Sequence, residues 1–132
     1  MTNGERSFLG YLPDGHQLSY SYRQSIYDVI VSEEFVRSAD RLDMQSISAK
    51  DIRAIEYFRW DTPITQQHDT YFSKAPPTTV PELVIRITPL GQQRVRSGDW
   101  SIGLLPHFGE SVVHVRPERL PLIVALVRGL SW

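Results

Sequence analysis

Histidine is the side chain best suited to acid–base and metal chemistry near neutral pH, and this chain carries four histidines. They lie at His16, His68, His107 and His114, without the close spacing that metal ligands need, and no cysteine adds to them. His68 and Asp69 could form a base with its orienting carboxylate, but adjacent side chains seldom face each other. We therefore interpret His68 and Asp69 as parts of a polar loop and His114 as a strand residue, and we expect neither a metal nor another cofactor.

Nucleophilic and phosphate-binding motifs are absent from the sequence. The serines stand in neither a Gly-x-Ser-x-Gly nor a Ser-x-x-Lys arrangement. The glycines form neither Gly-x-x-x-x-Gly-Lys nor Gly-x-Gly-x-x-Gly. Since no nucleophile, base and oxyanion donor can be assembled, we expect a non-enzymatic protein.

Charged residues form three local groups. Glu33-Glu34 and Asp40/Asp43 are interpreted as parts of solvated turns, and an acidic face for a basic partner stays open as the alternative. Arg94 and Arg96 flank Val95, so they project from one side of a predicted strand, and Arg86 could join them from a neighbouring strand. Because the only lysines are Lys50 and Lys74, this basic side does not favour phosphoinositide binding.

Aromatic and arginine side chains of the kind enriched in protein interfaces gather around a proline-rich stretch. We predict a partner-binding surface over residues 57–77, which the two strand arginines extend. The candidate residues are Tyr57, Arg59, Trp60, Tyr71, Phe72, Arg94 and Arg96.

Composition narrows the class of protein. The chain has 132 residues, 41% hydrophobic and 22% charged, as expected for one globular domain. Its net charge is -1, and its first half is the more acidic one, so a nucleic-acid partner is not expected. The lack of cysteine, of a signal-peptide core and of a long apolar stretch predicts a cytoplasmic protein without integral membrane association.

The first half of the chain has β character. Residues 1–16 are predicted to be a flexible lead-in, and a single domain is predicted over residues 17–132. Leu18, Tyr20 and Tyr22 alternate as in a strand, and a second extended run covers residues 27–37. A helix over residues 25–39 is the alternative, which the β-branched Val29-Ile30-Val31 run disfavours.

The remaining elements follow from turn residues and alternation. We expect a polar turn over residues 40–45, a tight turn entering a strand over 49–58, and a long proline-rich loop over 61–81. Further strands are predicted at 83–88, 92–96, 100–104 and 111–115. A helix is predicted from Pro117 to Gly129.

Three segments resemble the bacterial members of the pleckstrin-homology-like (PH-like) superfold. They are YDVIVSEEFV at 27–36, ISAKDIRAI at 47–55, and VRPERL at 115–120, which runs into an apolar helix. The resemblance covers about residues 17–130 and rests on hydrophobic spacing, and the 61–81 segment is longer than the pattern needs. It implies a mainly β (α+β) fold, in which a bent antiparallel sheet or partly open barrel is capped by one C-terminal helix.

Two functional classes remain. The first is an interaction module that binds a protein or peptide through the 57–77 region and the sheet surface. The alternative is an immunity-type inhibitor that neutralises a toxin or effector by covering its site with the acidic first half. A small enzyme or a lipid-binding domain ranks lower, and a homo-oligomer, with Trp132 as a candidate contact, is compatible with the sequence.

Overall fold

Antiparallel β-strands dominate the computed structural model, which describes residues 1–4 and 6–118. The mainly β fold expected from the sequence is therefore confirmed. The elements of the described part are β1 (Gln17–Gln24), β2 (Val29–Ser38), β3 (Arg41–Ala49), α1 (Ile52–Glu56), β4 (Ile64–Gln67), β5 (Thr70–Lys74), β6 (Thr79–Val80), β7 (Leu83–Arg86), β8 (Arg94–Ser97), β9 (Trp100–Gly103), α2 (Leu104–Phe108) and β10 (Val112–Val115).

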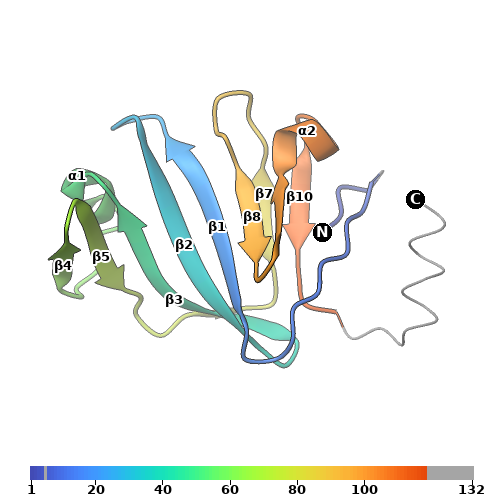
Figure 1. Cartoon of the computed structure of the whole chain (residues 1–132), viewed down its shortest axis with the longest axis horizontal. Helices are drawn as coiled ribbons and strands as arrows, with labels where there is room; N and C mark the ends of the chain where they lie inside the picture. The colour runs from blue at the N-terminus through green and yellow to red at the C-terminus, as the bar shows by residue number, and fades with distance from the viewer. Residues whose placement is uncertain (5, 119–132) are drawn as a thin grey trace.

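A large open sheet forms the body of the molecule. Its strands lie in the order β4-β5-β3-β2-β1-β8-β9, and β6 adds to β3. β1, β2 and β3 cross the middle, with β4, β5 and α1 at one end and β8 and β9 toward the other (Figure 1). The predicted strands over 17–22 and 27–37 are confirmed, and the alternative helix over 25–39 is not formed, since Val29–Ser38 pairs with strands on both sides.

One irregularity in β3 keeps the apolar side chains of that strand on a single face. The pairing of β2 with β3 shifts between Glu34 and Phe35, so that Gln45 has no counterpart on β2. Such a bulge lets residues three apart share a face. As a result Met44 and Ile47 both contact the hydrophobic core, although strict alternation would have put them on opposite faces.

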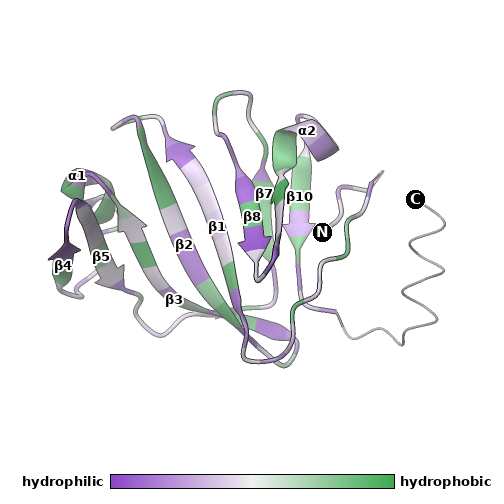
Figure 2. Ribbon diagram, viewed as in Figure 1, coloured by the Kyte–Doolittle hydropathy of each residue, from purple (hydrophilic) through white to green (hydrophobic). Residues whose placement is uncertain are grey.

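The face that carries the core, here called the inner face, holds two hydrophobic clusters. The first cluster joins Leu18, Phe35 and Leu42 of the large sheet to residues of β7, β10 and α2. The second joins Val31, Ile47 and Ala49 to Ala54 and Ile55 of α1. Met44 packs against both clusters. Figure 2 shows the two apolar stretches of β2 with a hydrophilic stretch between them.

β7 and β10 form a separate two-stranded sheet. The side chain of Gln93, just before β8, ties this pair to the large sheet: its Nε2 donates to the Arg86 carbonyl at 2.8 Å, and its Oε1 accepts from the Thr88 N–H at 3.4 Å. Thr2 exchanges two backbone hydrogen bonds with His114, at 3.1 and 2.8 Å. The start of the chain is thus tied to β10.

Several local predictions were wrong. Glu33 and Glu34 lie inside β2 and not at a turn, because the neighbouring strands pair along the whole of β2. The polar turn predicted over 40–45 is shorter, since β3 begins at Arg41 and the left-handed Ala39 (φ 55°) already reverses the chain. Residues 52–56 form helix α1, not a strand, because Asp51 caps the segment by accepting the Arg53 N–H at 2.9 Å.

The proline-rich 61–81 segment is not a plain loop. It contains the hairpin of β4 and β5 and the short β6. Its prolines stand outside these strands: Pro63 precedes β4, and Pro76 and Pro77 follow β5. The prolines therefore remove no hydrogen bond inside a strand.

The predictions for the last third divide into two groups. The strands near 83–88, 92–96, 100–104 and 111–115 are confirmed as β7, β8, β9 and β10, although α2 begins at Leu104. Most of the helix predicted from Pro117 to Gly129 lies outside the described residues, and Pro117 and Glu118 themselves are not helical. Within the described part, neither helix has the length and apolar character needed to cross a membrane.

Candidate functional site

The outer face of the large sheet, which points away from both hydrophobic clusters, carries aligned polar side chains. Where these side chains lie, the strands pair without a register shift. Residues paired across neighbouring strands therefore form straight rows that cross the sheet. One row, the first row, crosses β4, β5, β3, β2, β1 and β8. Its members are Thr65, Phe72, Ser48, Ser32, Ser21 and Arg94.

A second row runs beside the first, two residues further along each strand and so about 7 Å away. It crosses β5, β3, β2, β1 and β8, and its members are Lys74, Ser46, Glu34, Ser19 and Arg96. We call the two rows together the serine rows, since serines occupy the middle of the first row and both sides of Glu34 in the second. Ser21, Ser32, Ser46 and Ser48 are partly exposed, whereas Ser19 is buried.

The second row contains a hydrogen-bonded carboxylate. Glu34 Oε2 accepts a hydrogen bond from Gln17 Nε2 at 2.7 Å and another, short one from the Ser19 hydroxyl. The Ser97 hydroxyl donates to the Gln17 carbonyl at 2.5 Å. The two bonds from Gln17 and Ser19 hold the Glu34 side chain against β1.

A shallow depression of about 320 Å³ opens at this end of the second row. A carboxylate, a guanidinium and two hydroxyls border it, so it offers both donors and acceptors of hydrogen bonds to a polar group placed there. The residues that line it are Gln17, Ser19, Glu34, Arg96, Ser97 and Gly98.

The charges of the serine rows are mostly positive. Arg94, Arg96 and Lys74 are exposed, and Glu34 is the carboxylate among them. Arg94 donates to the Ser101 hydroxyl at 2.8 Å. The Arg96 side chain makes no hydrogen bond or ion pair with any residue of the described ranges, so its guanidinium is free to meet a partner.

The residues predicted to bind a partner divide among three environments. Phe72, Arg94 and Arg96 share the outer face, where Phe72 and Arg94 belong to the same row but are separated by the three strands β3, β2 and β1. Trp60 and Tyr71 pack against the second hydrophobic cluster on the inner side. Tyr57 and Arg59 follow α1 and are exposed, Tyr57 by 58%.

One expectation about the basic residues was wrong. Arg86 does not stand on a strand next to Arg94 and Arg96, because β8 pairs with β1 and β9 whereas β7 pairs with β10 in the other sheet. Sequence reasoning also missed the serines of the outer face. Their signal was present as Ser19/Ser21 and Ser46/Ser48, which alternate with apolar residues.

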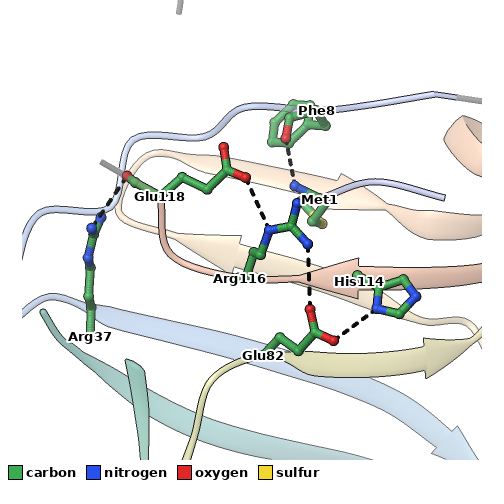
Figure 3. A network of polar contacts seen from close by, with 7 residues as sticks. All are labelled: Met1, Phe8, Arg37, Glu82, His114, Arg116 and Glu118. Carbon is green, nitrogen blue, oxygen red and sulfur yellow. Dashed lines mark hydrogen bonds and ion pairs between the residues drawn. The ribbon is translucent and has the colours of Figure 1, made fainter. Parts of the chain in front are cut away.

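A different polar network joins the segment before β7 to β10 and to the residues after it (Figure 3). Glu82 lies 3.1 Å from His114 Nδ1 and 3.7 Å from Arg116 Nη1, and Arg116 Nε lies 3.1 Å from Glu118 Oε1. The network links three separate segments of the chain, so we interpret it as a structural tie. Among the described residues no group of three histidines or carboxylates could hold a metal ion.

Comparisons of the chain with protein-family models, with curated proteins and with solved structures find no match. The fold and the site therefore define the protein by its structure alone, as an open antiparallel sheet with a mainly apolar inner face and a polar, serine-rich outer face.

Proposed function

We propose that this chain is a non-enzymatic interaction module that binds a protein partner on the outer face of its sheet. The observation that carries the proposal is the alignment of the serine rows across the sheet, which places Phe72 toward one end and Arg94 and Arg96 at the other. Short side chains allow a partner to approach the strands closely, and their hydroxyls can donate and accept hydrogen bonds.

The charge of this face favours a partner with an acidic patch. Three cations stand against one carboxylate in the serine rows, and Arg96 has no ion-pair partner within residues 1–4 and 6–118. Arginine at an interface can bind a carboxylate through two parallel hydrogen bonds. An immunity-type inhibitor that covers its target with an acidic surface finds less support here, because this face is mainly basic.

A pair of charge reversals tests the proposal. Arg96→Glu is expected to weaken partner binding at least about tenfold, equivalent to about 1.4 kcal/mol. Arg86→Glu is the matched control, since Arg86 is equally an exposed strand arginine but lies on β7. The partner is first identified in cells that make the protein, by photo-crosslinking from position 32 on the outer face, with position 84 as the reference site. Its affinity for each variant is then measured by titration calorimetry.

A steric variant tests the same face without a change of charge. Ser32→Tyr places a large side chain in the middle of the first row, between Ser21 and Ser48. Tyrosine is well tolerated in strands, so the fold should persist while binding is lost. If Ser32→Tyr and Arg96→Glu both leave every recovered interaction unchanged, the outer face is not the binding surface.

The finer assignment of the fold is also a proposal. We propose that the open sheet is of the PH-like kind, with a C-terminal helix over its open end. The order of β1, β2 and β3 as consecutive antiparallel neighbours supports it. An experimental structure of the whole chain tests it, and a sheet without that closing helix would contradict it.

A further inference from the structure

A half-buried carboxyl group stands on the inner face, where its neighbours are otherwise apolar or aromatic. Glu33 is paired across the strands with Tyr20 on β1 and with Ile47 on β3. Tyr20 packs on the first hydrophobic cluster and Tyr22 on the second, so Glu33 lies where the two clusters meet. Glu33, Tyr20 and Tyr22 all keep part of their surface in contact with solvent, so the position can be reached from outside.

The carboxyl group of Glu33 has a tyrosine neighbour but no cationic one among the described residues. Tyr22 forms a side-chain hydrogen bond with it, and burial, the larger effect, raises the pKa of Glu33 above its usual value. No lysine, arginine or histidine of the described part forms an ion pair with Glu33. A carboxylate accepts up to about four hydrogen bonds, so Glu33 can accept others besides that of Tyr22.

Two aromatic rings stand beside this carboxyl group. The centroids of the Tyr20 and Tyr22 rings are 5.1 Å apart, with an angle of 31° between the planes. The Tyr20 side chain lies next to that of Gln93, which joins the two sheets. A carboxylate beside aromatic rings is the chemistry that recognises an organic cation, through charge and through the π faces.

We propose that Glu33, Tyr20 and Tyr22 form a binding site for one organic cation, an ammonium or guanidinium group on an aliphatic stem, as in a lysine or arginine side chain of a partner protein. The carboxylate accepts hydrogen bonds from the cation, and the tyrosine rings and the adjoining apolar clusters contact the stem. This site lies on the opposite face of the sheet from the serine rows, and the inference does not rest on the proposed function of that outer face.

Small model cations test the site directly. n-Butylammonium stands for a lysine side chain and n-propylguanidinium for an arginine side chain, and n-butanol is the neutral analogue. At constant ionic strength, at least one cation should produce saturable shifts in the ring resonances of Tyr20 and Tyr22, and n-butanol should produce none. The stronger of the two cations identifies the preferred side chain.

The Glu33→Gln variant separates charge recognition from shape. It keeps the size of the side chain and should lower the affinity for the cation at least about tenfold, because only an ionised carboxylate supplies the charge. Glu56→Gln is the matched control: it removes one exposed carboxylate from α1 and should leave the response unchanged. Amide spectra of both variants establish that they are folded.

Two results would overturn the inference. One is a wild-type protein whose tyrosine resonances respond to neither cation, or respond equally to n-butanol. The other is a folded Glu33→Gln variant that binds the cation as tightly as the wild type. Neither result affects the outer-face proposal, which is tested by Arg96→Glu and Ser32→Tyr.

Discussion

The inner and outer faces of the sheet differ most clearly at two adjacent residues of the same type. Glu33 points to the inner face, between Tyr20 and Ile47, whereas Glu34 points to the outer face and accepts hydrogen bonds from Gln17 and Ser19. Burial raises the pKa of Glu33. Side chains of identical chemistry thus obtain different properties because strand residues alternate between faces.

This contrast also separates the two binding proposals. The outer face presents many small polar groups over a wide area, which suits a large protein surface. The inner face presents one carboxyl group between rings and apolar side chains, which suits a single cationic group. Each proposal can therefore fail without the other.

The largest expected difference in stability between the two faces appears when a new carboxylate is placed on each of them in turn. Val31→Glu puts a charge at a fully buried inner position, where it is expected to cost about 4 kcal/mol or more of the free energy of unfolding. Ser32→Glu places the same group on the outer face and should change that free energy by less than about 1 kcal/mol. Urea unfolding monitored by tryptophan fluorescence measures both, and equal losses would show that the faces are wrongly assigned.

A smaller effect is expected when the hydrogen bond to Glu33 is removed. Tyr22→Phe leaves the half-buried carboxyl group without its tyrosine donor, and we expect a loss of about 1–2 kcal/mol. Tyr71→Phe is the control, because the Tyr71 hydroxyl has no hydrogen-bond partner among the described residues and its ring packs on the same second cluster. Similar losses in both variants would mean that the Tyr22 hydroxyl contributes nothing specific.

The stability of the protein should depend on pH through Glu33. Because burial raises its pKa in the folded state, the folded state holds this proton at pH values where the unfolded state has released it. The stability linked to this proton is present in acid and is lost as pH rises through the raised pKa. Tyr20 and Tyr22 face the group, and since burial raises their pKa values as well, neither titrates in this range.

Glu33→Gln tests this dependence, since glutamine resembles the protonated carboxyl group at every pH. The variant should unfold at a higher urea concentration than the wild type at pH 7.5, and the difference should shrink at pH 4. Groups common to both proteins cancel in the comparison. A difference that stays constant between the two pH values would contradict a raised pKa.

The strands with a clear alternation could be predicted from the sequence. Leu18, Tyr20 and Tyr22 lie on the inner face, and Ile85 and Ile87 are buried, because a period of two places every second side chain on the core. The hairpin of β4 and β5 was missed, since prolines near a strand look like prolines within it until pairing is known. Helix α1 has only five residues and depends on burying Ala54 and Ile55, so its own sequence could not reveal it.

The candidate sites were harder to predict than the strands. Phe72 and Arg94 were singled out for their side-chain types, but their shared row depends on the register of four strand pairings from β5 to β8. Glu33 was assigned to a turn because two adjacent glutamates are polar, and the pairing of β2 on both sides overrode that local preference. Register between distant strands is set by tertiary packing, which one sequence does not display.

The smallest change in stability is expected at Arg96. Arg96→Ala removes an exposed side chain that forms no ion pair with any described residue, so the free energy of unfolding should change by less than about 0.5 kcal/mol. Urea unfolding measures this change, and calorimetry with the crosslinked partner measures the affinity. Weaker binding with unchanged stability would assign Arg96 to the interface, because only the complex then uses its charge. A loss of stability above 1 kcal/mol would instead show that Arg96 supports the sheet, and the outer-face proposal would lose its principal cation.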